Sequence, residues 1–114
     1  MMMRSEQMGD LTSGAQRRAD TEMVDYARRR FPTKFAQTPQ ETMMRIVKEI
    51  RNRAAGDGFE REDHVASYLD FTVMYGPDFS RSEWAQPILE NDAYNVDQKI
   101  QALSTRVEET GVKL

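Results

Sequence analysis

The sequence predicts an all-α protein, a compact bundle of four to five helices that follows a flexible N-terminal arm. Apolar residues recur every three to four positions in several windows, as they do on one face of a helix. The windows are bounded by capping residues, glycine and proline, which start and stop helices. No window alternates apolar and polar residues over the length of a strand, so we expect no sheet.

Residues 1–18 are expected to form the arm, and residues 19–114 a single helical domain. The arm contains Gly9 and Gly14 and has no periodic apolar pattern, as is common in mobile termini. The chain has 114 residues, which fits one domain of the usual size of roughly 100 to 200 residues.

The first helix is expected from Asp20 or Thr21, either of which can cap it, to about Phe31. Pro32 ends this helix, because proline disfavours the α conformation in the residue before it. One face of the helix carries Met23, Ala27 and Phe31.

The second helix has the clearest signals. Thr38 and Glu41 flank Pro39 as a capping box, in which the hydroxyl and the carboxylate each satisfy an unpaired backbone N–H. Gly56 is expected to end the helix, since glycine takes positive φ without a Cβ penalty. The apolar stripe consists of Met43, Ile46, Val47, Ile50 and Ala54.

The third helix is expected to begin near Glu60 and to end by Gly76. Its first turn is acidic, as the positive end of the helix dipole favours. Its apolar surface is broad, so we expect this helix to pack on more than one side and to form the centre of the fold. That surface carries Val65, Tyr68, Leu69, Phe71, Thr72, Met74 and Tyr75.

Two shorter helical segments complete the prediction. A fourth helix is expected from Ser80 or Ser82, either of which can cap it, to about Glu90, and Pro87 inside it predicts a kink or a loosely formed first turn. A fifth helix is expected over residues 95–110, because Asn95 and Gln98 form a second capping box.

Phe79 and Trp84 lie in the connection after the third helix, and two roles are open for them. In the structural interpretation, Phe79 packs back onto the next helix and Trp84 fills a corner between helices. In the functional interpretation, the two rings are exposed and anchor a partner, since aromatic residues dominate binding hot spots.

Composition excludes several classes of function. The chain has no cysteine, which excludes disulfides, thiolate metal sites and cysteine nucleophiles. It has no apolar run near the roughly 20 residues that a membrane span needs, so we expect no membrane partner. The N-terminus lacks the apolar stretch of a signal peptide, and a cytoplasmic location fits best.

No catalytic or metal constellation is recognisable. His64 is the only histidine, and we expect it to be a surface residue in the first turn of its helix. No nucleophile accompanies it in a triad pattern. The acidic residues near it do not have the spacing of a calcium loop. We therefore predict a protein that is not an enzyme, with no catalytic residues, no metal site and no cofactor.

Charge is distributed unevenly along the chain. Residues 1–56 contain eleven Lys and Arg against seven Asp and Glu, whereas residues 57–92 contain two against nine. This asymmetry indicates either internal pairing or a polarised docking surface, and ordinary scatter over solvated faces explains it equally. Arg28, Arg29 and Arg30 form the most concentrated basic face.

The chain contains eight methionines. Three of them stand at its start. Met23, Met43, Met44 and Met74 either fill the core or line an adaptable groove, because methionine repacks readily around varied partners.

The segment that follows the third helix resembles small helical proteins encoded beside spike and effector genes in bacterial type VI secretion clusters. In that family, a helix ending in glycine leads into a Gly-Pro-x-Phe turn, a Trp-Ala-x-x-Ile-Leu segment and a final helix. The resemblance covers residues 31–107, and the matching residues are Gly76, Pro77, Phe79, Trp84, Ala85, Ile88 and Leu89. It implies an accessory role as effector chaperone, adaptor or neutralising partner, and it brings no catalytic residue.

The sequence therefore predicts a non-catalytic protein-binding accessory module whose partner is a secretion effector or a spike component. The alternative is a nucleic-acid-binding regulatory protein that uses the basic face, although a pI of about 5.2 argues against it. A homodimer is compatible with either role. The predicted contact residues are Arg28, Arg29, Arg30, Phe79 and Trp84.

Overall fold

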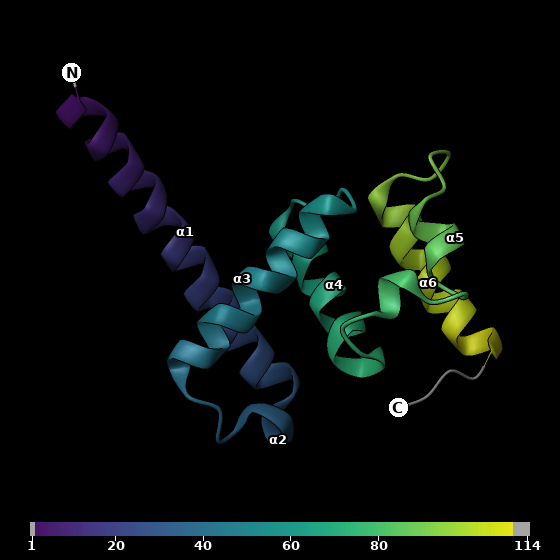
Figure 1. The fold of residues 1–114 in the computed structure, drawn as a ribbon. Coiled ribbons are helices and arrows are strands. Elements are labelled where there is room, and N and C mark those ends of the chain that lie inside the picture. The colour runs from purple at the N-terminus through teal and green to yellow at the C-terminus, as the bar shows by residue number, and fades with distance from the viewer. Residues whose placement is uncertain (1, 111–114) are drawn as a thin grey trace. The chain divides into compact units, whose positions relative to one another are not determined.

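The computed structural model describes the backbone of residues 2–110 and the side chains of residues 14–109 (Figure 1). Within these residues the chain is helical and has no strand, so the predicted all-α fold class is confirmed. The elements are α1 (Met2–Arg30), α2 (Pro32–Phe35), α3 (Gln40–Gly56), α4 (Glu62–Tyr75), the 3₁₀ helix η1 (Phe79–Arg81), α5 (Gln86–Leu89) and α6 (Val96–Thr110).

Helix α1 begins much earlier than expected, at Met2 rather than at Asp20. The two glycines in its first half each cost about 1 kcal/mol of helix propensity relative to alanine, and the long side chains around them favour helix. The predicted end holds, because α1 stops at Arg30, just before Phe31 and Pro32. The predicted flexibility of residues 1–18 is a statement about motion, which the backbone geometry does not test, and it stays a prediction.

The chain divides into two compact units, Met1–Lys48 and Glu49–Leu114. The division falls inside α3, and each unit is described below by itself. The prediction that residues 19–114 form a single domain stays a prediction.

In the first unit, α2 packs against α1 and the core is mainly aliphatic. The Phe31 and Phe35 rings meet edge to face, with centroids 6.3 Å apart. The predicted apolar faces of the first two helices point inward at most positions. The buried hydrophobic residues are Met23, Val24, Ala27, Phe35, Met43 and Val47.

In the second unit, α4 packs against α6 and η1. The broad apolar surface predicted for this helix is buried at Val65, Tyr68, Leu69 and Phe71. Gly76 closes α4 with φ of 100°, and its N–H donates to the carbonyl of Thr72 at 2.9 Å. A side chain with a Cβ would be strained at this φ, so the stop predicted at Gly76 has a direct physical cause.

The segment between α4 and α6 differs from the single fourth helix that was predicted. It forms η1 and the four-residue α5, with Pro87 in the first turn of α5. In a helix running from residue 82, Pro87 would have no N–H to donate to the carbonyl four residues earlier, and its ring would clash with that carbonyl. The helix therefore begins at Gln86, where Pro87 lies in the first turn. The predicted capping box of α6 is confirmed, since Asn95 and Gln98 exchange two hydrogen bonds of 2.8 Å each. Among the described residues, no helix combines the length and the apolar character needed to cross a membrane.

Candidate protein-binding surfaces

Arg28, the first residue of the predicted basic face, is engaged inside the first unit. Its guanidinium donates to the carbonyl of Phe35 at 2.7 Å and to that of Thr38 at 2.9 Å. A third, longer bond of 3.3 Å reaches Oε1 of Gln40. Arg28 thus ties α1 to α2 and to the start of α3, and its guanidinium donors are engaged within the first unit.

Arg29 and Arg30 remain at the surface at the end of α1. The guanidinium carbon of Arg30 lies 5.1 Å from the centroid of the Phe31 ring, within the range of a cation–π contact. The basic face predicted from three arginines therefore has two exposed members.

Phe79 lies in the core of the second unit. It is 3% exposed, and its ring centroid is 5.0 Å from that of Tyr68 and 5.7 Å from that of Phe71. In this structure Phe79 is therefore inaccessible to a partner, as the structural interpretation of this residue requires.

Trp84 lies at the edge of the same cluster and is only partly buried. Its ring packs edge to face against Tyr75, with centroids 5.4 Å apart, and is 6.2 Å from Phe79. The indole N–H donates to no acceptor among the described residues, and no buried nitrogen there lacks a partner. The N–H is therefore accessible to solvent. We call Tyr75 and Trp84 together the aromatic edge.

His64 was expected at the surface, and this expectation is wrong. The residue is 8% exposed, and its Nε2 lies 2.8 Å from Oδ1 of Asp97 on α6. The imidazole also meets Phe59 edge to face, with centroids 6.3 Å apart. Ser67, the nearest hydroxyl along the helix, donates instead to the carbonyl of Asp63 at 3.3 Å. His64 thus joins α4 to α6 through its contact with Asp97.

A pocket of about 380 Å³ in the second unit has the Tyr68 hydroxyl in its lining. This hydroxyl donates to Oδ2 of Asp57 at 2.7 Å. Burial raises the pKa of Tyr68 to about 12; the hydrogen bond with Ser80 opposes this shift, and the one with Asp57 adds to it. The hydroxyl is therefore neutral at physiological pH. Arg53, also in the lining, is engaged with the carbonyl of Pro77 and with Glu49.

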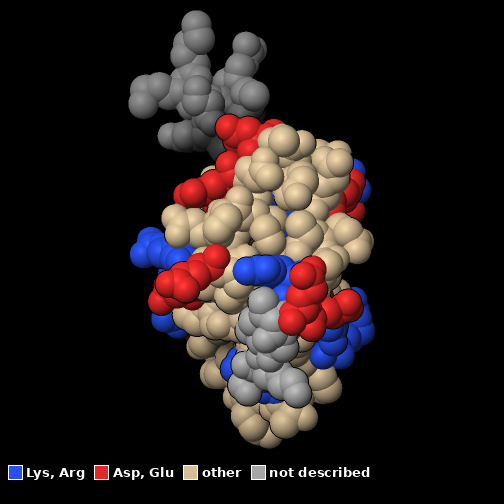
Figure 2. Space-filling view, turned by 90° about the vertical axis from the view of Figure 1, so that its right-hand side faces the viewer, with Lys and Arg blue, Asp and Glu red and all other residues tan. Residues whose placement is uncertain are grey.

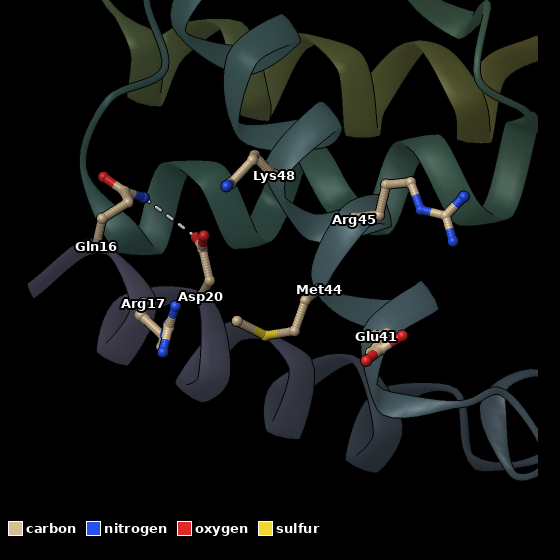
Figure 3. Close-up of a pocket in the computed structure, with 7 residues that line it drawn as sticks. All are labelled: Gln16, Arg17, Asp20, Glu41, Met44, Arg45 and Lys48. Atoms are coloured by element: carbon tan, nitrogen blue, oxygen red, sulfur yellow. Dashed lines mark hydrogen bonds between the residues drawn. The ribbon is translucent and has the colours of Figure 1, made fainter. Parts of the chain in front are cut away.

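A larger pocket, of about 580 Å³, lies between α1 and the first half of α3, within the first unit (Figure 3). Thr21 on α1 contacts Met44 on α3 there, with Oγ1 and Sδ 3.9 Å apart. Among the lining residues, the side-chain amide of Gln16 donates to Asp20 at 3.1 Å. We call this pocket the α1–α3 groove; it is lined by Gln16, Arg17, Asp20, Glu41, Met44, Arg45 and Lys48.

Acidic and basic side chains are interspersed on the face of the molecule that Figure 2 presents. No single sign of charge covers that face. The charge asymmetry along the sequence thus does not produce a one-sign patch on this side.

Among residues 14–109, no group of three or more potential ligands is placed to hold a metal ion. Comparison of the chain with protein-family models, with curated proteins and with solved structures gives no match. The resemblance to secretion accessory proteins therefore stays a prediction.

Sequence reasoning missed the pairing of His64 with Asp97 and the α1–α3 groove. The histidine and its partner are 33 residues apart, and nothing in either local pattern links them. A partial signal existed for the groove, because Arg45 and Lys48 lie off the apolar stripe of α3 and Met44 lies beside it. The missing information was which face of α1 would stand opposite.

Proposed function

We propose that this chain is a non-catalytic protein-binding module that acts as an accessory to a larger assembly. The observation that carries the proposal is the aromatic edge. Trp84 is held against Tyr75 and Phe79, while its indole N–H is accessible to solvent and has no acceptor among the described residues. A fixed apolar ring with one free donor is the kind of group that dominates binding energy at protein interfaces.

The packing behind the aromatic edge supports this role. Phe79 is buried beneath Trp84, and Tyr75 lies against it, so the indole has neighbours on its inner side. An aromatic side chain that is already restrained loses less conformational entropy on binding than a mobile one. The exposed part of Trp84 is therefore suited to enter an apolar pocket of a partner.

The partner that we propose is an effector or a spike component of a type VI secretion system. The support for this choice is the resemblance of residues 31–107 to accessory proteins of that system. In this proposal the complex forms in the cytoplasm, the location expected from the sequence. Arg29 and Arg30, exposed at the end of α1, are the further contact residues.

The test removes the side chain of Trp84, the only tryptophan of the chain. A purified type VI effector or spike component from the source organism is titrated into the protein, and binding is measured by calorimetry. We expect a saturable complex that Trp84→Ala weakens by a factor of about 30 or more, as for a hot-spot side chain. Tyr94→Ala is the matched control, because Tyr94 is an exposed aromatic residue outside the edge, and we expect the same affinity as in the wild type.

Two results would overturn the proposal. One is the absence of any complex with these components. The other is a complex to which Trp84→Ala and Tyr94→Ala bind equally, with both variants folded by circular dichroism. A mobility shift of nucleic acid at low salt that is lost in the Arg29→Glu, Arg30→Glu double variant would favour the regulatory alternative instead.

A further inference from the structure

The exposed charges of the α1–α3 groove are mostly positive, although its whole lining contains three cations and the two carboxylates of Asp20 and Glu41. Arg17, Arg45 and Lys48 are exposed, and none of them forms an ion pair with a residue that the structure describes. Asp20 is 1% exposed and already accepts the hydrogen bond from Gln16. Of the exposed charged residues in the lining, only Glu41 is therefore negative.

The cations are spread along the groove. In Figure 3, Lys48 extends from α3 toward the pair formed by Gln16 and Asp20, whereas Arg45 extends away from that pair. Arg17 projects from α1. Three separated cations do not converge on one small anion, so they suit an elongated ligand with several negative groups.

An apolar side chain lies among these charges. Met44 is partly buried, and its sulfur is in contact with the hydroxyl of Thr21 across the groove. Methionine adapts its shape to varied apolar partners at little cost. The groove thus presents one apolar contact with cations around it, the arrangement that an amphipathic acidic helix complements.

We infer that the α1–α3 groove binds an acidic amphipathic peptide segment of a partner protein, with an apolar residue of the segment on Met44 and its carboxylates beside Arg17, Arg45 and Lys48. A nucleic acid fits less well, because its row of phosphates would place no apolar group on Met44. This surface consists of residues of the first unit only, so the inference does not depend on the aromatic edge.

The experiment uses the full-length protein and a fluorescein-labelled amphipathic peptide of glutamate, leucine and alanine. Its affinity is measured by fluorescence anisotropy, beside a counterpart peptide with lysine in place of glutamate. We expect binding of the acidic peptide only, weakened by added salt because the contacts are ionic. The Arg17→Glu, Lys48→Glu double variant reduces the affinity by about tenfold or more, since attraction at two positions becomes repulsion.

Two further variants keep the test specific. Arg45→Glu changes one cation of the groove and is expected to weaken binding by a smaller factor. Lys34→Glu makes the same change of charge at an exposed residue of α2 outside the lining, and it is expected to leave the affinity unchanged. Circular dichroism establishes that each variant keeps its helical content.

The inference fails if the acidic peptide does not bind, or if Lys34→Glu weakens binding as much as the groove variants do. It also fails if a single-stranded oligonucleotide binds through the same cations more tightly than the peptide at equal salt. A second copy of the chain is the remaining possible occupant of the groove, and sedimentation tests it. A homodimer that the double variant dissociates would assign the groove to that second copy and would overturn the inference. If the acidic peptide does not bind but the complex with the effector or spike component still depends on Trp84, this inference alone is overturned. The proposed function then stands.

Discussion

The two units of the chain build their interiors from different side chains. The first unit, Met1–Lys48, buries methionine, valine and alanine, with Phe35 as its one buried ring among the described residues. The second unit, Glu49–Leu114, has a continuous cluster of aromatic rings with neighbouring centroids 5.0 to 6.3 Å apart. Its members are Phe59, His64, Tyr68, Phe71, Tyr75, Phe79 and Trp84.

This difference determines how each unit connects its helices. Aromatic rings bury large areas and hold their neighbours in a fixed geometry, so the second unit is joined mainly by packing. The first unit packs mainly aliphatic side chains, and the guanidinium of Arg28 links its helices by binding two backbone carbonyls. The surfaces follow the same division, because the aromatic edge belongs to the second unit and the cationic α1–α3 groove to the first.

The largest effect is expected from removing a ring of the aromatic cluster. Phe59 is fully buried, and its centroid is 5.3 Å from that of Tyr68. Phe59→Ala leaves a cavity and is expected to lower the free energy of unfolding by about 4 kcal/mol. Urea unfolding followed by Trp84 fluorescence measures this loss within the second unit. Tyr94→Ala, which removes an exposed ring, should change the same quantity by less than about 0.5 kcal/mol; similar losses in both variants would contradict the packing argument.

The next effect tests the polar link of the first unit. Arg28→Ala removes a charged donor from the carbonyls of Phe35 and Thr38. We expect a loss of about 3 kcal/mol in the free energy of unfolding, the upper range for hydrogen bonds that involve a charge. Urea unfolding followed by far-ultraviolet circular dichroism measures it.

Arg29→Ala is the neighbouring control, with an exposed side chain and no expected change beyond about 0.5 kcal/mol. The fluorescence of Trp84 reports unfolding of the second unit, so it can be compared with the circular dichroism transition of the same variant. If Arg28→Ala shifts the fluorescence transition as far as the circular dichroism transition, the two units unfold together. Equal stability of the Arg28 and Arg29 variants would instead show that the carbonyl contacts contribute nothing.

A smaller effect is expected at the hydroxyl of Tyr68, a polar group inside the aromatic cluster. Tyr68→Phe keeps the ring and removes the hydrogen bond to Asp57, at a cost of about 1.5 kcal/mol. The pKa of the Tyr68 hydroxyl is raised to about 12, so the folded state disfavours its ionised form. The contribution of this group to stability is therefore complete below the ordinary tyrosine pKa of about 10 and is lost as the pH rises toward 12.

Spectrophotometric titration of tyrosinate checks this prediction. The wild type, with four tyrosines, should show a component that ionises near pH 12, and Tyr68→Phe should lack it. The wild type should also lose stability faster than Tyr68→Phe between the two pKa values. The explanation by burial is wrong if the late component persists in the variant.

The fold class and most helix ends followed from local signals in the sequence. Gly76, Pro32 and the pair of Asn95 and Gln98 act on backbone within a few residues, so their effects do not depend on tertiary structure. The extent of α1 and the division into η1 and α5 were not predicted. In the η1–α5 segment, weak helix propensities compete over a short stretch, and the single residue Pro87 decides where α5 begins. In α1, the glycines of the first half weaken the helix signal without ending the helix.

The candidate surfaces were only partly predictable, for a related reason. For Phe79 and Trp84, packing and partner binding were both left open, and the structure separates the two residues: Phe79 is buried and Trp84 is partly exposed. Arg28 was assigned to a docking surface. The carbonyls that it binds lie seven and ten residues further along the chain, so no local pattern in the sequence revealed these contacts. Periodicity tells which side of a helix is apolar, but it does not tell which distant group will stand opposite.

The smallest effect concerns the start of α6 in the second unit. Asn95→Ala removes the side chain that accepts the N–H of Gln98, and an N-cap of this kind contributes about 1 kcal/mol. Because α6 also reaches α4 through Asp97 and His64, fraying of its first turn should weaken that link as well. Amide hydrogen exchange should become faster in the first turn of α6 and stay unchanged in α1, whereas Ser104→Ala on the exposed side of α6 should alter neither. Faster exchange in α1 as well would show that the second unit transmits its local opening to the first, and the contrast between the two interiors would then not extend to their dynamics.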